Sequence, residues 1–553
     1  MICRLSANVL TGGPVHVAAG APDPDTANRW RHPGMTQLPG ETRSDASPSG
    51  ATDPAALGQT VLIDGPVTAE ALLAAGVTLR PSPRQLAWQR LEITAFVHFG
   101  VNTYTGHEWG DGMEDPSIFA PEHLDCDQWA RELAAAGCEL AILTIKHHDG
   151  FVLYPTRYTD HSVRSSSWRG GSGDVLREFT DAGRRHDLRV GVYISPADEH
   201  EFRYGRYANG SARTMRSIPS PVPGDDRPAD APRFELPATD YGTYMLDQLY
   251  EVLTQYGPID VVWFDGANGH VPDDRVETYD FDSWCRLVRE LSPGTVLDDK
   301  APDARWVGNE DGLAREDKEW SVVPTSWTGR RRGVALDEML PDVGSRVALA
   351  DAALAGADGM SWWPAEADVS IRPGWFYHPD ESPKTPSELL EIYYFSVGRN
   401  AVLLLNVPPT PDGRFDDADV ASLRGWRELL DAELPGDVAA VPGSRHSGAI
   451  DHTTLLTVPA PVAFDRIVLR EDITEGQQVE AAVVSASADG TTWQEVARVT
   501  TIGYKRILRL PLPVTAVAVR VEITAARASA RVDVELHLST VPTDDPPTSG
   551  ATA

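Results

Sequence analysis

The sequence predicts an α/β fold in which a (β/α)8-like TIM barrel is followed by a C-terminal all-β sandwich. Three observations lead to this prediction. From about residue 85 to 435, short apolar runs alternate with helical patterns; several of these runs are apolar on consecutive residues; and after about residue 440 the pattern changes to period two. Consecutive apolar residues are typical of parallel strands covered by helices on both faces, whereas period two is typical of antiparallel sheets.

The same patterns divide the chain into four segments. A chain of 553 residues is too long for one ordinary core, so two or more domains are expected. Both ends are rich in Pro, Gly, Ser, Thr and Asp without an apolar period, which is typical of disorder. We expect a low-complexity N-terminal segment at 1–55, the barrel with its lead-in at 56–435, the sandwich at 440–541 and a disordered tail at 542–553.

The barrel strands are expected at the apolar runs, which are 91–100, 138–146, 188–195, 259–266, 294–299, 358–366 and 401–407. The segments between them have helical spacing. In "DYGTYMLDQLYEVLTQYG", for example, Met245, Leu249 and Val252 share one face before a Gly-Pro pair ends the helix. No GxGxxG follows the first strand, which favours a barrel over an open doubly wound sheet. In such barrels the chemistry lies at the carboxyl ends of the strands.

The region after residue 440 is rich in Val, Ile and Thr, as in "QVEAAVVSASADGTTWQEVARVTT", and is interrupted by turn sequences such as "ADGT". This pattern predicts an all-β sandwich of roughly 100 residues. It resembles the galactose-binding-like or discoidin-like jelly rolls that are appended to many carbohydrate enzymes. The resemblance implies either a sugar-binding domain or a packing support without a ligand of its own.

The composition excludes several kinds of partner. The formal charge is −32, and nucleic-acid binding needs clustered Lys and Arg, so no nucleic-acid partner is expected. No eighteen apolar residues run together and no clear signal peptide is present, so we expect a cytoplasmic protein without a membrane partner, with secretion left open. The cysteines, which show no CxxC pattern and are expected to be reduced, are Cys3, Cys126, Cys138 and Cys285.

Polar residues gather at the ends of the predicted strands: His98, then His147 and His148, then Tyr193, then Asp265. Polar side chains at buried strand ends need hydrogen-bond partners or a ligand, and each of these alone could equally be a satisfied core residue. Because side chains alternate along a strand, the two adjacent histidines are expected to point to opposite faces. Their spacing does not place two imidazoles on one ion, so no metal is expected.

Asp265 has two interpretations. In "VVWFDG" the Asp-Gly pair is a turn signal at the end of a strand. Alternatively the carboxylate has a chemical role, because the apolar run before it predicts a partly desolvated setting in which it needs histidine or tyrosine partners. Trp109 and Trp263, which stand beside carboxylates, favour sugar stacking, although aromatic residues are also good core material.

Six motifs occur in a characteristic order: "HFGVNTYTGHEWGDG", "ILTIKHHDGFVLYP", "GVYISPADEH", "YGPIDVVWFDG", "RWVGNEDGLAREDKEWSVVP" and "LLLNVPP". Together they resemble glycoside hydrolase family 29, the α-L-fucosidases, over roughly residues 82–425. The version with "WVGNE" is most similar to the branch specific for α-1,3 and α-1,4 linkages. Two departures are Ala197 and Tyr154, where relatives often have Trp, so the shape of the subsites is expected to differ.

The resemblance implies an exo-acting retaining α-L-fucosidase that removes α-1,3- or α-1,4-linked L-fucose from branched, Lewis-type glycans by double displacement. It implies that Asp265 is the nucleophile and Glu310 the acid/base. Glu310 must hold a proton to assist departure, and like charges nearby in the sequence would favour this, namely Asp311, Glu316 and Asp317. The residues implied to bind or stack on the fucose ring are His98, Glu108, Trp109, His147, His148, Tyr193 and Trp263.

The segment 362–378, dense in Trp, Tyr and acidic residues, is a candidate acceptor-side wall, with Trp363 and Glu366 as its contacts; its aromatic residues could equally shield the barrel mouth. No cofactor is expected, and the partner is a fucosylated oligosaccharide or glycoconjugate. Two alternatives remain: an inactive carbohydrate-binding protein on the same fold, and a metal-dependent hydrolase.

Overall fold

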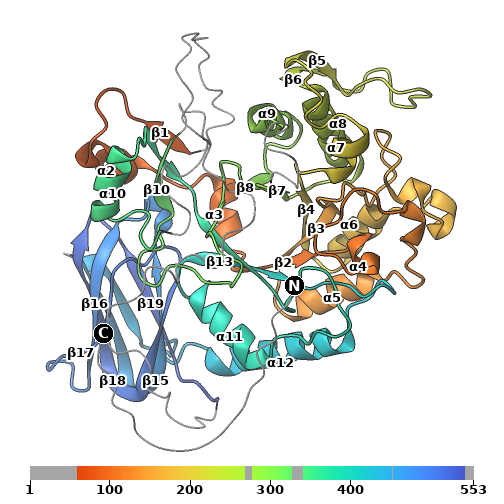
Figure 1. Cartoon of the computed structure of the whole chain (residues 1–553). Coiled ribbons are helices and arrows are strands. Elements are labelled where there is room, and N and C mark those ends of the chain that lie inside the picture. The colour runs from red at the N-terminus through yellow and green to blue at the C-terminus, as the bar shows by residue number, and fades with distance from the viewer. Residues whose placement is uncertain (1–58, 268–276, 327–339, 451, 542–553) are drawn as a thin grey trace, which may run out of the picture. The chain divides into compact units, whose positions relative to one another are not determined.

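The computed structural model describes residues 59–267, 277–326, 340–450 and 452–541 (Figure 1). The predicted disordered segments 1–55 and 542–553 lie outside the described residues. In the described ranges, no helix is long and apolar enough to cross a membrane. Cys126, Cys138 and Cys285 are buried free thiols, and burial raises the pKa of each; Cys3 lies outside the described residues.

Eight parallel strands form the central sheet, in the order β8–β7–β4–β3–β2–β13–β12–β9. Their bounds are β2 (Ile93–Val97), β3 (Leu140–Lys146), β4 (Arg189–Ile194), β7 (Val261–Phe264), β8 (Val296–Asp299), β9 (Arg305–Trp306), β12 (Ala365–Ser370) and β13 (Ala401–Asn406). Helices follow most of these strands along the chain, as in TIM barrels. The predicted barrel-like α/β fold is confirmed.

Two strand predictions differ from the structure near β12. The expected strand 358–366 is two strands: β11 (Gly359–Trp362) pairs antiparallel with β1 (Thr60–Leu62) and β10 (Val322–Thr325), and β12 begins only after Pro364. Proline has no amide N–H for a ladder, which suits the point where the chain leaves one sheet for another. The eighth strand, β9, is two residues long, too short to produce a sequence pattern.

The sheet has two edges, β8 and β9, which do not pair with each other. Asp303, in the loop 300–304 between them, has a buried carboxylate that bonds to the β8 side of this gap. Its Oδ2 accepts a hydrogen bond from the backbone N–H of Leu297 in β8 at 3.0 Å, and Arg84 donates to both of its oxygens at 3.0 Å. A side chain therefore bonds the edge of β8 where a neighbouring strand would have done so. We call the loop 300–304 the seam loop.

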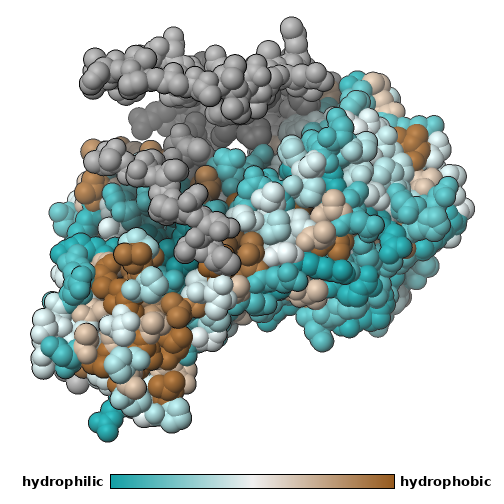
Figure 2. Space-filling model, turned by 90° about the horizontal axis from the view of Figure 1, so that it is seen from below, coloured by the Kyte–Doolittle hydropathy of each residue, from teal (hydrophilic) through white to brown (hydrophobic). Residues whose placement is uncertain are grey.

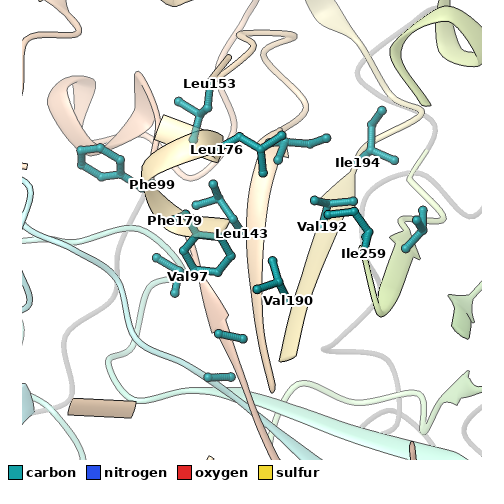
Figure 3. Packing of buried hydrophobic residues seen from close by; sticks show 14 of the residues in the cluster. Val97, Phe99, Leu143, Leu153, Leu176, Phe179, Val190, Val192, Ile194 and Ile259 are labelled. Atoms are coloured by element: carbon teal, nitrogen blue, oxygen red, sulfur yellow. The ribbon is translucent and has the colours of Figure 1, made fainter. Parts of the chain in front are cut away.

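Helices pack on the outside of the barrel through the residues of the strands that point outward. The helices around it are α3 (Pro83–Gln89), α5 (Cys126–Ala135), α6 (Val175–Arg185), α8 (Asp240–Gln255), α9 (Phe281–Leu291), α11 (Pro386–Phe395) and α12 (Asp417–Glu433). Figure 3 shows one such contact, in which Leu176 and Phe179 of α6 lie against Val97, Leu143 and Val190 of three strands. In α8, the predicted apolar face is buried, and the helix ends before Gly257, whose φ of 77° suits glycine.

The structure also contains shorter helices and strands outside the central sheet and its covering helices. They are α2 (Ala69–Thr78), α4 (Asn102–Thr105), α7 (Glu199–Tyr204), α10 (Arg346–Leu354) and the hairpin of β5 (Thr214–Ile218) with β6 (Phe234–Ala238). Helix starts follow the usual chemistry: the Thr239 side chain accepts from the Gly242 amide at the start of α8, and Asp174 does the same for Arg177 at the start of α6.

The C-terminal region is an antiparallel sheet, as its period-two pattern predicts. Its strands are β14 (Arg445–Ile450), β15 (Thr453–Glu471), β16 (Val479–Ser487), β17 (Gln494–Val499), β18 (Arg506–Ala526) and β19 (Val532–His537). They bury a hydrophobic cluster of their own. Hydrophobic residues also gather at one end of the face shown in Figure 2, over this sheet.

Polar contacts bind the C-terminal sheet to the barrel region. Lys505 Nζ donates to Glu92 Oε2 at 2.6 Å, just before β2, and Arg466 Nε donates to Glu433 Oε2 at 2.6 Å, at the end of α12. The backbone N–H of Ser321 donates to Gln477 Oε1 at 2.6 Å. These contacts lie on side chains that are largely removed from water, where such bonds are stronger than at the surface.

Candidate active site

The pleat of the barrel strands decides which side chains face the barrel interior. Phe96 of β2 and Trp263 of β7 are three strands apart in the sheet, yet their rings contact at 5.3 Å, so both point inward. Because side chains alternate, the residues two positions further on, His98 and Asp265, are directed to the interior at the carboxyl ends of their strands. Tyr193 of β4 belongs to the same inner cluster.

Asp265 directly follows β7 and is held by two hydrogen bonds. The Tyr193 hydroxyl donates to its Oδ2 at 2.7 Å, and the backbone N–H of Ala267 donates to its Oδ1 at 2.6 Å. His148 Nε2 lies 4.0 Å from Oδ2. The side chain is 21% exposed, so it is accessible from the barrel mouth. The two bonds hold the carboxylate in a fixed orientation.

His98 is a buried, neutral imidazole with a fixed orientation. Desolvation lowers its pKa to about 4, in spite of the hydrogen bond with Asn406. Its Nδ1 lies 2.8 Å from Asn406 Oδ1, and the Asn406 amide nitrogen donates to Ser370 Oγ and to the carbonyl of Trp375. The amide oxygen of Asn406 therefore accepts, so His98 carries its proton on Nδ1, which leaves Nε2 as an acceptor.

His147 and His148 do not point to opposite faces, because the extended backbone on which that prediction depended ends before them. Strand β3 ends at Lys146, and the chain turns there, with the Gly150 N–H donating to the His147 carbonyl at 3.0 Å. The two rings lie 4.0 Å apart. His148 Nδ1 is 2.7 Å from Ser195 Oγ, whereas the buried His147 Nδ1 has no hydrogen-bond partner among the described residues. A buried polar atom of this kind is suited to a polar ligand group.

Glu108 and Trp109 come from the loop after α4 and reach the same place. The Trp109 ring lies over His148, with 3.9 Å between ring centroids. Glu108 accepts hydrogen bonds from the Trp375 backbone N–H at 2.8 Å and from His378 Nε2 at 2.7 Å. In this structure Glu108 therefore joins its loop to the segment that follows β12.

Glu310 lies beside Trp375, in a solvent-exposed position. The Trp375 indole N–H donates to its Oε2 at 3.2 Å. Its loop runs along β12, because Gly312 N–H donates to the Asp368 carbonyl at 2.9 Å and Asp311 forms an antiparallel bridge with Val369. The acidic neighbour that interacts with Glu310 is Asp368.

The prediction that Glu316 and Asp317 crowd Glu310 finds no support in their contacts. Both residues face the C-terminal sheet: the Glu316 carbonyl accepts from Arg506, and the Asp317 carbonyl accepts from Thr500. Their charges act on Arg399 and Arg506. Proximity in the sequence did not predict proximity in space here, because the chain turns toward the C-terminal sheet within six residues of Glu310.

Trp363 and Glu366 do not reach the mouth. The Trp363 side chain is 5% exposed, and its indole N–H donates to the carbonyls of Ala301 and Ala304 in the seam loop. Glu366 is fully buried inside the barrel, where its Oε1 accepts from the indole N–H of Trp263 at 2.8 Å. From the same segment 362–378, the structure instead brings Trp375, Phe376 and His378 to the mouth.

Glu366 and Asp298 form a pair of buried carboxyl groups beneath the site. Burial raises the pKa of Asp298 to about 7, and burial together with the charge of Asp298 raises that of Glu366. Asp298 Oδ2 and Glu366 Oε2 are both buried and have no hydrogen-bond partner among the described residues. Because burial and the neighbouring carboxyl both favour the protonated form, we expect the pair to retain a proton near neutral pH.

This shared proton predicts a pH dependence of stability. The pKa of Asp298 is higher in the folded protein than in the unfolded chain, so its contribution is present at low pH and is lost as the pH rises toward 7. In Asp298→Asn the amide donates to Glu366 without a proton being needed. We expect the Tm of this variant to fall less between pH 5 and pH 8 than that of the wild type, as measured by differential scanning calorimetry.

Asp489→Asn is the control for this prediction, because the hydrogen bonds from Thr492 and Thr491 lower the pKa of the exposed Asp489. Its contribution is therefore lost only as the pH falls, and the change in Tm between pH 5 and pH 8 is expected to match the wild type. Equal slopes for Asp298→Asn and the wild type would show that the pair does not retain a proton.

Several residues of the site were not predicted. Asn406 and Asp368 lie at inward positions of β13 and β12, and the alternation along "AVLLLN" and "AEADVS" is the signal that could have found them. Trp375 and Ser195 come from loops, for which no periodicity exists. Among the described residues, no group of three or more His, Cys, Asp or Glu side chains is arranged to hold a metal ion.

Comparisons with known proteins agree with this geometry. One family model, described as Alpha-L-fucosidase, matches residues 83–432. The protein Alpha-L-fucosidase 1 of Arabidopsis thaliana is 35% identical over 459 residues, which cover 78% of this chain and 81% of that protein.

Solved structures resemble the chain over a similar extent. A glycoside hydrolase 29 family member from an unknown rumen bacterium has 33% identity and a TM-score of 0.67, covering 85% of this chain and 79% of that one. The Ruminococcus gnavus GH29 fucosidase E1_10125, solved in complex with fucose, has 27% identity and a TM-score of 0.67, covering 84% of this chain and 95% of that one.

Proposed function

Because the chain belongs to the α-L-fucosidase family, glycoside hydrolase family 29, we propose that it is an exo-acting, retaining α-L-fucosidase that removes α-1,3- or α-1,4-linked L-fucose from branched, Lewis-type glycans. The observation that carries this proposal is the position of Asp265. It lies at the carboxyl end of β7, hydrogen-bonded to Tyr193 and close to three histidines, and Trp375, which lies against His98, donates to Glu310.

Asp265 is proposed as the nucleophile. In the first step an Oδ atom of Asp265 bonds to the anomeric carbon while the bond from that carbon to the glycosidic oxygen breaks. The Tyr193 hydroxyl and the Ala267 N–H hold the carboxylate in one orientation before the reaction, so little reorganisation is needed. The ionised carboxylate also stabilises the positive charge that develops on the ring.

Glu310 is proposed as the acid and base. Its proton passes to the glycosidic oxygen as that bond breaks. In the second step a water molecule attacks the anomeric carbon, the bond from that carbon to the Asp265 oxygen breaks, and the proton that the water loses passes to Glu310. Its exposed position and its hydrogen bond from Trp375 fit this role, because the acid must meet a leaving group that extends into solvent.

The neutral histidines and the aromatic residues are proposed to bind the sugar ring. His98 offers Nε2 as an acceptor for a hydroxyl, and His147 offers its unpartnered Nδ1. Trp109 stacks on His148 and covers the same side of the mouth. The related Ruminococcus gnavus GH29 fucosidase was solved in complex with fucose, which supports fucose as the sugar that is bound. Trp263 is proposed to support the sugar-binding residues from beneath the site, since its ring stacks on the Tyr193 ring with 5.3 Å between the ring centroids.

The linkage preference is a prediction of its own. The loops that carry Glu108, Glu310 and Trp375 meet around the mouth, so a branch sugar beside the fucose can contact them and lower the barrier. Lewis a and Lewis x trisaccharides are expected to be hydrolysed at least about 10-fold faster, in kcat/KM, than 2′-fucosyllactose or an aryl fucoside. Chromatographic separation of released fucose from the purified protein measures this. Equal rates on all four substrates would contradict the branch assignment but not the fucosidase activity.

A further inference from the structure

Asp368 is a buried carboxyl group that the proposed reaction does not use. It lies on β12 two residues after Glu366, so both point into the barrel, Asp368 nearer the mouth. The side chain is 4% exposed, and its Oδ1 accepts a hydrogen bond from the indole N–H of Trp306 at 2.7 Å. Burial of a carboxyl group costs free energy unless hydrogen bonds, a proton or a charged partner compensate for the lost hydration.

Glu310 and Asp368 are carried by two backbone segments that are bonded to each other. Gly312 N–H donates to the backbone carbonyl of Asp368, and Asp311 forms an antiparallel bridge with Val369. This register places Glu310 opposite Ser370, so Glu310 and Asp368 are diagonal neighbours on one face of the pair of segments, and the Trp375 indole N–H donates to Glu310 Oε2. The two acids are thus carried by backbone segments that are bonded to each other, which keeps their relative position constant.

The charges around the two acids disfavour a double negative charge. Burial raises the pKa of Asp368 well above its usual range, and the charges of Glu310 and Asp299 raise it further, whereas the Trp306 hydrogen bond lowers it. Glu366 adds a further carboxyl below. The nearby cation is Lys300, whose Nζ lies 3.3 Å from Asp299 Oδ1 and 5.6 Å from the Trp306 ring centroid. Adjacent carboxyl groups in such a setting lose their protons in two separated steps.

We propose that Asp368 is a positioning residue for a proton: it forms a carboxyl pair with Glu310, and the pair keeps one proton available to the departing glycosidic oxygen. This inference rests on the proposed role of Glu310 as acid. Asp368 acts through Glu310. When Glu310 gives its proton to the leaving oxygen, the pair is left without the shared proton, and the proton that water releases in the second step restores it. Repulsion between two like charges disfavours the doubly ionised pair, so it keeps the proton on the pair before the transfer and favours its recovery afterwards.

The test is the pH dependence of kcat/KM, which reports the ionisation of the free enzyme. In Asp368→Asn, which keeps the Trp306 hydrogen bond, Glu310 titrates alone, so the alkaline limb for a Lewis trisaccharide is expected to move about one pH unit or more toward acid. With α-L-fucosyl fluoride, whose leaving group needs little protonation, the same variant is expected to retain activity within about threefold across that pH range.

A second variant is expected to move the alkaline limb of the pH profile in the opposite direction. Trp306→Phe removes the hydrogen bond that favours ionised Asp368, so the alkaline limb is expected to move toward higher pH. This result also covers the case in which Asp368→Asn does not fold, which circular dichroism would reveal. A uniform loss of rate at all pH values, or unchanged limbs in both variants, would overturn the proposal and leave Asp368 a structural residue.

Glu310→Ala separates this proposal from the function on which it rests. If that variant loses activity equally on the trisaccharide and on the fluoride, Glu310 is not the acid and the pair has no catalytic proton to hold. If the variant loses activity mainly on the trisaccharide while Asp368→Asn keeps the wild-type limb, the acid assignment stands and only the pairing with Asp368 is wrong.

Discussion

Replacement of Asp265 by glycine is expected to lower kcat/KM for a Lewis trisaccharide by about 10⁴-fold or more, because the carboxylate proposed to bond to the anomeric carbon is removed. The vacated space lets a small anion attack in its place. Added azide is therefore expected to restore turnover of α-L-fucosyl fluoride and to yield β-fucosyl azide, which mass spectrometry and proton NMR identify.

Tyr193→Phe is the matched control, since it removes the hydroxyl that bonds Asp265 but keeps the carboxylate and the ring. The expected loss in this variant is about 10- to 100-fold, without rescue by azide. Wild-type turnover in Asp265→Gly would refute the assignment of the nucleophile, and an azide product of α configuration would refute the double displacement.

Replacement of Glu310 by alanine is expected to have the second largest effect, a loss of about 10² to 10⁴-fold on a Lewis trisaccharide. The loss should be much smaller on α-L-fucosyl fluoride, because fluoride departs with little help from an acid. The comparison of kcat/KM for the two substrates measures how strongly the rate depends on proton donation.

Glu316→Ala is the control for this prediction. Glu316 lies six residues further on, and its carboxylate acts on Arg399 and Arg506 beside the C-terminal sheet, away from the mouth. Its kcat/KM is expected to stay within about twofold of the wild type on both substrates. A loss in Glu316→Ala with the same substrate dependence would move the acid role from Glu310 to Glu316.

The barrel could be predicted from the sequence because its strands are apolar on consecutive residues and are separated by helical patterns. The inward positions His98, Tyr193 and Asp265 followed from the same runs, since each lies at the end of one. Elements without a pattern could not be predicted: β9 is two residues long, and the break at Pro364 divides one apolar run between two sheets.

The rest of the site depends on loops, and there the sequence was least informative. Whether His147 and His148 face one ligand depends on where β3 ends. The sequence of β3 contains both apolar and polar residues, so it does not show that the strand ends at Lys146. Trp363 and Trp375 belong to one aromatic-rich segment, yet the first is bonded to the seam loop and the second to Glu310. The backbone geometry after β12 decides which aromatic residue reaches the mouth. This segment is a loop, so no helix or strand periodicity predicts its side-chain directions.

The gap between β8 and β9 has a mechanical consequence for the site. Elsewhere the barrel is joined by ladders of backbone hydrogen bonds, but here the junction is the Asp303 side chain and the seam loop. Asp298 lies on one side of the gap, and Trp306, which holds Asp368, lies on the other. At this gap the wall is therefore held by loop and side-chain contacts, and these separate Asp298 from Trp306 and Asp368, whereas strand ladders connect the strands that lead to Asp265, Tyr193 and His98.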